Sequence, residues 1–295
     1  MYRLFSILAI LTLALSSCDL SFSSRAPDVL TTTTILADVT RNVVGNRFSV
    51  GSLLPAGADP HSYQPTPQDA TKINKSKLLI INSTEYESFL NTLLQNANTQ
   101  KDPIEASAGL RLRTDPEGGQ GVDPHVWLDP KNMIVYVENI RDGLTRFDPE
   151  GAATYKSNAS AYIEKLQELD AWINGQVSQI PPQQRQLVTN HEALGYFANR
   201  YGFTVVGTII KSFSSDASPS AQQMAGLVDQ IKLYKAPAIF LDAPDNPALA
   251  QQIASETGVK VITNLHLESL TDGPPAATYI DMMKYDVTQI VNALK

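Results

Sequence analysis

Two of the four histidines in this 295-residue chain stand at the end of the same tripeptide, Asp-Pro-His. The first copy, in "GADPHSYQPTPQD", ends at His61, and the second, in "GVDPHVWLDP", ends at His125. Proline restricts the backbone before the imidazole, and an aspartate two positions upstream can accept hydrogen bonds from nearby backbone amides. Such a turn fixes the direction of a ring, and two such turns indicate two rings aimed at one point. We therefore expect both histidines to bind a metal ion.

A third histidine, His191, directly follows the apolar run "QLVTN". All three imidazoles then fall just beyond a predicted strand, or in a loop beyond one, where open α/β sheets place their ligand groups. The spacings, 125 − 61 = 64 and 191 − 125 = 66 residues, are far longer than those of a zinc finger. We expect tertiary structure to gather these side chains from two lobes.

The elements that must position these residues alternate between two patterns. Short apolar runs rich in β-branched residues predict strands at 29–36, 48–56, 77–83, 186–190, 203–209, 238–242 and 259–265. Segments with helical periodicity lie between them, at 37–45, 66–76, 85–97, 130–147, 192–202, 220–235, 246–258 and 276–294. This order predicts an α/β fold in which two lobes contain parallel sheets flanked by helices.

One segment, 149–181, interrupts the alternation. It has prolines near both ends and no strand pattern. Its apolar and aromatic residues have helical spacing, through Tyr155, Tyr162, Leu166, Leu169, Ile173 and Val177. About 26 helical residues would span roughly 39 Å, which is more than one small domain needs. We interpret the segment as a long helical strut that joins an N-terminal α/β lobe, 28–148, to a C-terminal α/β lobe, 182–295. A helix that pairs with a coiled-coil partner is the alternative.

The N-terminus has the composition of an export signal. Residues 1–17 contain one basic residue, a run of about a dozen apolar residues and small residues before Cys18. The apolar run is shorter than the roughly 20 residues that span a bilayer. The chain contains one cysteine, and "LSSC" fits the bacterial lipoprotein signal, in which the cysteine becomes the lipidated first residue. We expect a signal peptide at 1–17, lipidation of Cys18 and a flexible tether at 18–27.

The charge balance excludes some classes of partner. Removal of residues 1–17 leaves 22 basic and 30 acidic residues, a formal net charge of 22 − 30 = −8. An acidic chain without a basic run is not typical of a nucleic-acid-binding protein or of a protein held to a membrane by a polybasic patch. We expect no nucleic-acid partner, attachment to the membrane through lipid on Cys18, and a monomer.

Four blocks together resemble one family. "GADPHSYQPTPQD", "DPHVWLDPKNM", "NHEALGYFANRYGF" and "LHLESLTDGPPAATYIDMMKYDV" are similar, in order, to blocks of the cluster-A metal-binding lipoproteins, the solute-binding components of zinc and manganese ABC importers. The resemblance covers nearly the whole chain from about residue 28. It implies one metal ion held between two α/β lobes joined by a long helix, and an ABC permease as the membrane partner.

Carried over block by block, the resemblance implies four ligands: His61, His125, His191 and Glu268. Manganese members of the family tend to have Glu at the third position and Asp at the fourth, so His191 matches the zinc pattern. Three imidazoles and one carboxylate also suit tetrahedral Zn²⁺, whereas Mn²⁺ prefers more oxygen ligands. His266 could replace or supplement Glu268 because side chains two apart in an extended segment point the same way. Asp242, at a predicted strand end, could be a ligand or could orient one.

The resulting hypothesis is a protein that captures Zn²⁺ outside the cytoplasmic membrane and delivers it to an ABC-type permease, with Mn²⁺ as the less favoured ion. The lipid anchor would hold it at the outer face of that membrane, on the periplasmic side if an outer membrane is present. Four protein ligands close the coordination sphere, whereas a catalytic zinc keeps one position open. A zinc hydrolase or lyase that uses the same histidines, and a surface adhesin, remain the alternatives.

Overall fold

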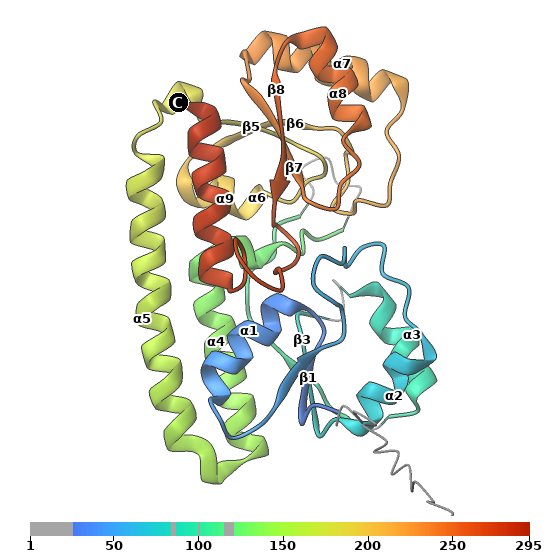
Figure 1. Cartoon of the computed structure of the whole chain (residues 1–295), viewed down its shortest axis with the longest axis vertical. Coiled ribbons are helices and arrows are strands. Elements are labelled where there is room, and N and C mark those ends of the chain that lie inside the picture. The colour runs from blue at the N-terminus through green and yellow to red at the C-terminus, as the bar shows by residue number, and fades with distance from the viewer. Residues whose placement is uncertain (1–25, 84–86, 100, 115–120) are drawn as a thin grey trace, which may run out of the picture.

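The computed structural model describes residues 26–83, 87–99, 101–114 and 121–295 (Figure 1). The predicted signal peptide at 1–17 and the lipidation site Cys18 lie outside these residues. Within them, no helix is both long enough and apolar enough to pass through a bilayer.

The N-terminal sheet consists of four parallel strands in the order β2-β1-β3-β4. The strands are β1 (Val29–Thr31), β2 (Val50–Ser52), β3 (Leu78–Ile81) and β4 (Ile104–Glu105). Their helices are α1 (Thr34–Val44), α2 (Pro67–Lys75), α3 (Ser88–Ala97) and α4 (Pro130–Phe147). All four residues of β3 are buried, as expected for a strand covered by helices on both faces.

The C-terminal sheet repeats this architecture, in the parallel order β6-β5-β7-β8. The strands are β5 (Gln186–Thr189), β6 (Thr204–Thr208), β7 (Ala238–Asp242) and β8 (Lys260–Leu265). The helices are α6 (Gly195–Tyr201), α7 (Ala221–Tyr234), α8 (Ala248–Thr257) and α9 (Tyr279–Leu294). Loops at the carboxyl ends of strands in both sheets face the junction between the lobes, where Figure 1 shows segments of the two halves meeting.

The segment predicted as a strut forms one 26-residue helix, α5 (Ala152–Val177). Its buried residues follow one another at intervals of three or four, which places them on a single face. That face packs against α1 and α4 of the first half and against α9 of the second, so α5 runs along both lobes (Figure 1). The domain bounds 28–148, 149–181 and 182–295 remain a prediction.

Apolar packing connects the two halves as well as filling each of them. One cluster of buried residues contains side chains from β1, α1 and α4 together with side chains from β5, α6, β7 and α9. A polar contact reinforces it, because Asp38 on α1 accepts a 2.9 Å hydrogen bond from the backbone N–H of Tyr279 at the start of α9. Two further clusters each stay within one lobe. The lobes therefore share a core.

Two details of the first sheet differ from the sequence prediction. The run at 29–36 contains a strand of only three residues, because Thr33 caps α1 by accepting a hydrogen bond from the N–H of Leu36. The strand β4 was not predicted, since two residues are too few to show alternation. Neither difference moves a metal-ligand candidate.

Candidate metal centre

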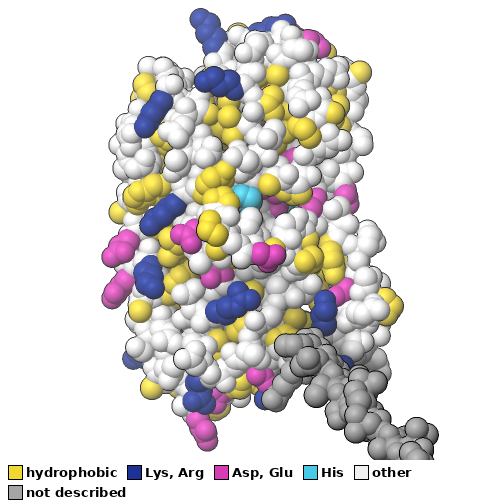
Figure 2. Space-filling model, viewed as in Figure 1, with side chains coloured by type: hydrophobic (Ala, Val, Ile, Leu, Met, Phe, Trp, Pro, Cys, Tyr) yellow, Lys and Arg dark blue, Asp and Glu magenta, His cyan; other side chains and the backbone are white. Residues whose placement is uncertain are grey.

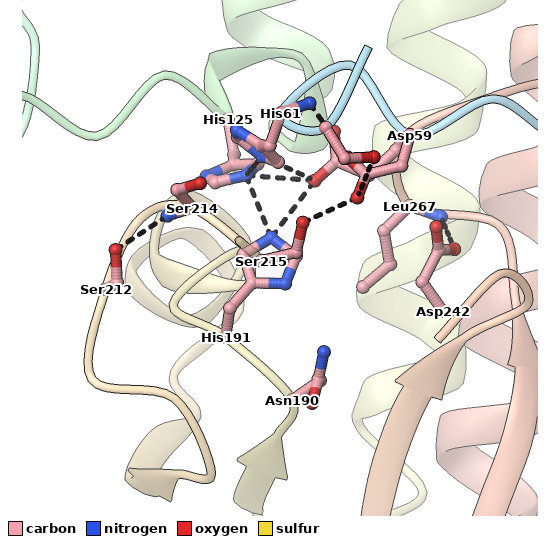
Figure 3. Close-up of polar contacts among 12 residues, drawn as sticks. Asp59, His61, His125, Asn190, His191, Ser212, Ser214, Ser215, Asp242 and Leu267 are labelled. Atoms are coloured by element: carbon pink, nitrogen blue, oxygen red, sulfur yellow. Dashed lines mark hydrogen bonds and ion pairs between the residues drawn. The ribbon is translucent and has the colours of Figure 1, made fainter. Parts of the chain in front are cut away.

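The structure brings together four side chains that lie far apart in the sequence. The ligand atoms of His61, His125, His191 and Glu268 all lie within 4.8 Å of one another. His61 comes from the loop between β2 and α2, and His125 from the turn before the 3-10 helix Val126–Leu128. His191 follows β5 by two residues, and Glu268 follows β8 by three. Each lobe therefore supplies two of the four side chains, and the imidazoles converge in Figure 3.

The spacing of these atoms suits one shared ion. The distances are 3.3 Å for His61 Nε2 to His125 Nε2, 3.3 Å for His191 Nε2 to His125 Nε2, 3.2 Å for His191 Nε2 to Glu268 Oε1, 2.9 Å for His125 Nε2 to Glu268 Oε1 and 3.6 Å for His61 Nε2 to Glu268 Oε1. Ligands about 2.0–2.1 Å from a tetrahedral zinc ion lie about 3.3–3.4 Å from one another. The five distances scatter around that value.

The site is buried and electrostatically coupled. Burial alone would lower the pKa of His125, but the charge of Glu268 and the hydrogen bond to Asp123 raise it to about 10. Burial likewise would raise the pKa of Glu268, yet His125 and the neighbouring imidazoles hold it well below its usual range. Burial lowers the pKa of His191, and the hydrogen bond to Glu268 Oε1, which favours the protonated ring, offsets only part of this effect. Without an ion the site therefore holds a proton on His125 next to an ionised Glu268.

The two Asp-Pro-His triplets form similar turns, in which the aspartate accepts a hydrogen bond from the N–H of the histidine. Asp59 Oδ1 accepts a 2.8 Å hydrogen bond from the N–H of His61, and Asp123 Oδ1 accepts a 3.0 Å hydrogen bond from the N–H of His125. Asp123 Oδ1 also lies 2.8 Å from His125 Nδ1. A carboxylate on the far ring nitrogen fixes the tautomer and leaves Nε2 free to bind metal. Asp123 therefore orients His125 through both its backbone N–H and its ring.

Asp59 also forms a hydrogen bond between the two lobes. Its Oδ2 accepts hydrogen bonds from Ser62 Oγ at 3.2 Å and from Ser215 Oγ at 2.5 Å, and Ser215 belongs to the loop between β6 and α7 (Figure 3). The His61 side chain is 7% exposed, whereas those of His125 and His191 are 0% and 3% exposed. On the face shown in Figure 2, histidine surface is limited to one small spot near the level where the halves meet.

A guanidinium group next to Asp123, that of Arg113, was not predicted from the sequence. Arg113 Nη1 lies 3.5 Å from Asp123 Oδ2, and its guanidinium stands over the ring of Tyr196. Tyr196 donates a 3.0 Å hydrogen bond to the carbonyl of Asp123 and accepts one from the N–H of Arg113. A Cβ at position 195 would lie 1.5 Å from Arg113 Nη1, so a side chain there would displace the guanidinium from this place. Nothing near Arg113 in the sequence indicates this role.

Two other candidates lie outside the group of four. The ring of His266 packs against Tyr285, with ring centroids 5.5 Å apart. Asp242 accepts a 2.6 Å hydrogen bond from the N–H of Leu267, so it holds the backbone next to Glu268. Burial raises the pKa of Asp242 well above its usual range, and the charge of Glu268 adds to the shift. Neither belongs to a metal-binding group among the described residues.

The turn around His191 differs in one respect from the expectation of a helix that starts at residue 192. Helix α6 begins at Gly195, and residues 191–194 form a turn instead. The carbonyl of His191 accepts hydrogen bonds from the N–H of Ala193 at 2.9 Å and from Thr189 Oγ1 at 2.7 Å. These contacts hold the backbone of His191 at the end of β5.

Comparison with known proteins decides the family. A family model described as ZnuA, "Zinc-uptake complex component A periplasmic", matches residues 29–293. The chain belongs to this family. Its curated relatives are metal-binding, substrate-binding lipoproteins of ABC transporters, so this chain is a solute-binding protein and not an enzyme. The predicted membership of the cluster-A family is confirmed.

Individual relatives within the family carry names for different metals. The manganese-binding lipoprotein MntA of Halalkalibacterium halodurans is 34% identical, over 98% of this chain and 97% of the relative. The iron-binding protein YfeA of Yersinia pestis is also 34% identical, over 97% of this chain and 94% of the relative. Similarity therefore extends over nearly the full length of both proteins.

Solved structures of the family have the same fold. The Mn-bound periplasmic metal-binding protein of Candidatus Liberibacter asiaticus has a TM-score of 0.80 and 30% identity, with 90% of this chain and 99% of that chain covered. The periplasmic zinc-binding protein TroA of Treponema pallidum has a TM-score of 0.83 and 26% identity, with 91% and 99% covered. The predicted two-lobed α/β fold is confirmed.

Proposed function

We propose that this protein captures Zn²⁺ between its two lobes, outside the cytoplasmic membrane, and delivers it to the permease of an ABC importer. The observation that carries the proposal is the convergence of three imidazoles and one carboxylate, from four distant segments, at the spacing of ligands around one ion. The metal is cargo here, so the site must bind it tightly and still release it.

The choice of zinc rests on the donor set. Three nitrogen ligands and one carboxylate oxygen make a borderline-soft, four-coordinate site typical of Zn²⁺. Mn²⁺ prefers more oxygen ligands. The names of the relatives include manganese, iron and zinc, and they support a divalent transition-metal ion without choosing among the three. Zn²⁺ is therefore proposed ahead of Mn²⁺.

The proposed location follows from Cys18, the chain's one cysteine. Several relatives are named as lipoproteins, which supports an acyl anchor on this residue at the outer face of the cytoplasmic membrane. On the face shown in Figure 2, basic and acidic side chains are interspersed, so no basic patch there competes with the lipid as a membrane attachment.

The experiment that tests the metal is competition on the purified mature protein. The protein is stripped with a chelator, dialysed against equimolar Zn²⁺ and Mn²⁺, and assayed by mass spectrometry for both elements. We expect one zinc ion per chain and little manganese. Retention of manganese over equimolar zinc would overturn the choice of ion, and binding of neither would overturn the proposed function.

A growth assay separates transport from adhesion. In the native organism, Ala substitutions of the four candidate ligands should abolish growth on scarce zinc and leave adhesion to surfaces intact. If the substitutions change adhesion and do not change growth on scarce zinc, the adhesin hypothesis replaces the transport proposal.

Proton release should accompany zinc binding. Because the empty site keeps a proton on His125 up to a pKa of about 10, the ion must displace that proton to use Nε2 at pH 7. We expect about one proton released per ion between pH 7 and 8.5, and thus an affinity that rises about tenfold per pH unit. At lower pH, protonation of His191, whose pKa burial holds below its usual value, should steepen the loss of affinity.

Calorimetric titration in buffers of different ionisation enthalpy measures the proton number directly. An apparent binding enthalpy that is independent of the buffer across this range would contradict a protonated His125 in the empty site.

A further inference from the structure

The backbone that leads to Glu268 is held by two buried carboxyl groups of the C-terminal lobe. The N–H of His266 donates a 2.9 Å hydrogen bond to Asp286 Oδ1, on α9. The next N–H, that of Leu267, donates a 2.6 Å hydrogen bond to Asp242 Oδ1, at the end of β7, as Figure 3 shows. Each carboxyl side chain belongs to a residue that is only 3% exposed. Two successive peptide groups are thereby fixed within one lobe.

The third contact comes from the other lobe. Trp127 Nε1–H donates a 2.8 Å hydrogen bond to the carbonyl of Leu267, which belongs to the peptide bond that joins Leu267 to Glu268. Trp127 follows His125 by two residues, and the rings of these two residues lie 5.5 Å apart. The carbonyl of Trp127 accepts a 2.7 Å hydrogen bond from Tyr279 Oη, at the start of α9. Trp127 is 2% exposed and is held through both its indole N–H and its backbone carbonyl.

We propose that Trp127 is a positioning residue that joins the His125 turn to the Glu268 segment, so that the placement of the carboxylate ligand depends on contact between the lobes. Without the indole N–H, the Leu267–Glu268 peptide group loses this hydrogen bond to the His125 turn and can rotate. Glu268 then moves relative to the imidazoles, and the ion leaves faster. This inference rests on the proposed function, since it concerns how the same site retains its cargo.

The chain supplies a matched control for the test. Trp172, the second of its two tryptophans, lies half-buried on α5 and packs against the apolar cluster shared by the lobes. Trp127→Phe and Trp172→Phe therefore make the same chemical change near the site and away from it. The first removes the N–H that reaches Leu267, whereas the second removes no hydrogen bond to a ligand segment.

Two measurements on the full mature chain report whether Glu268 keeps its position at the metal ion. The rate of Zn²⁺ release to excess chelator should rise at least about tenfold in Trp127→Phe, the size of effect typical of residues that orient metal ligands, and should stay native in Trp172→Phe. With Co²⁺ as the probe, the visible spectrum should change in Trp127→Phe only. Native release and a native Co²⁺ spectrum in Trp127→Phe would overturn the inference.

A general loss of protein stability must be distinguished from displacement of the Glu268 side chain. The melting temperature of the metal-free protein is measured for both variants, and a change in release that merely follows this temperature in both would assign Trp127 a structural role and overturn the inference. If Trp127→Phe does not fold, the benzothiophene analogue of tryptophan is incorporated in the Trp172→Phe background, because it keeps the ring shape and replaces the N–H with sulfur. Faster release supports the inference and native release overturns it.

The hydrogen bond from the N–H of Leu267 to Asp242 can be tested by a separate pair of variants. Asp242→Asn keeps an acceptor oxygen for the N–H of Leu267, whereas Asp242→Leu removes it at similar volume. We expect near-native release from the first variant and faster release from the second. Equal rates of Zn²⁺ release from both variants would show that the hydrogen bond between Leu267 and Asp242 does not help to position Glu268. If wild-type protein binds no divalent ion, the proposed function itself fails, and this inference fails with it.

Discussion

His191→Ala should weaken Zn²⁺ binding by more than about 100-fold, because loss of a residue that only orients a ligand already costs about 10–100-fold. His191 Nε2 lies 3.3 Å from His125 Nε2 and 3.2 Å from Glu268 Oε1, and no further His, Asp or Glu among the described residues joins the four candidate ligands in one metal-binding group. A water molecule would complete the coordination sphere of the variant. Competition with a chromogenic zinc chelator measures the affinity.

His266→Ala is the matched control for this variant. It deletes an imidazole that is close in sequence to Glu268, but whose ring packs against Tyr285 outside the group of four. We expect native affinity. Native affinity in His191→Ala would exclude His191 as a ligand, and a large loss in His266→Ala would make His266 a ligand.

Zinc should also raise the melting temperature of the protein by about 8–16 °C. An ion at 1,000 times its dissociation constant stabilises the folded state by about 4 kcal/mol, and each kcal/mol raises the melting temperature of a chain of this size by about 2–4 °C. The effect requires folding because the four ligands come from segments that meet only in the folded protein. Differential scanning calorimetry with and without zinc gives the shift.

Variants distinguish this linkage from nonspecific stabilisation by the ion. The shift should shrink strongly in His61→Ala, which removes a ligand of the N-terminal lobe, and should persist in His266→Ala. An equal shift in both variants, or no shift in the wild type at saturating zinc, would contradict an ion that bridges the lobes.

Much of the fold was predictable because its patterns are local. The 26 residues of α5 have a buried face at helical spacing, and the buried run at β3 contains only apolar residues. The two-residue strand β4 was missed because its pairing with β3 depends on the sheet and not on its own sequence. The early end of β1 depends on Thr33 acting as a helix cap, which a run of four threonines does not reveal.

The candidate site was predictable to different degrees. His61 and His125 were identified from a repeated triplet, and His191 from its place after a strand. Glu268 was identified only through resemblance to a family, since nothing local distinguishes it from other acidic residues.

The contacts that orient these side chains were not predictable. Arg113 reaches Asp123 only because Gly195, distant in sequence, leaves room for it. The Trp127 hydrogen bond joins residues 140 positions apart. Such pairs depend on the tertiary structure, which no pattern within one segment contains.

The shared core has a consequence for how the protein comes apart. Since α9 follows the strands of the C-terminal lobe but buries its face against α1 of the N-terminal lobe and against the linking helix α5, neither half has a complete interior of its own. Heat should therefore melt both halves in one cooperative transition. A fragment that stops before Tyr279 should lack the apolar surface of α9 that packs on α1 and α5 and helps to keep the N-terminal half folded.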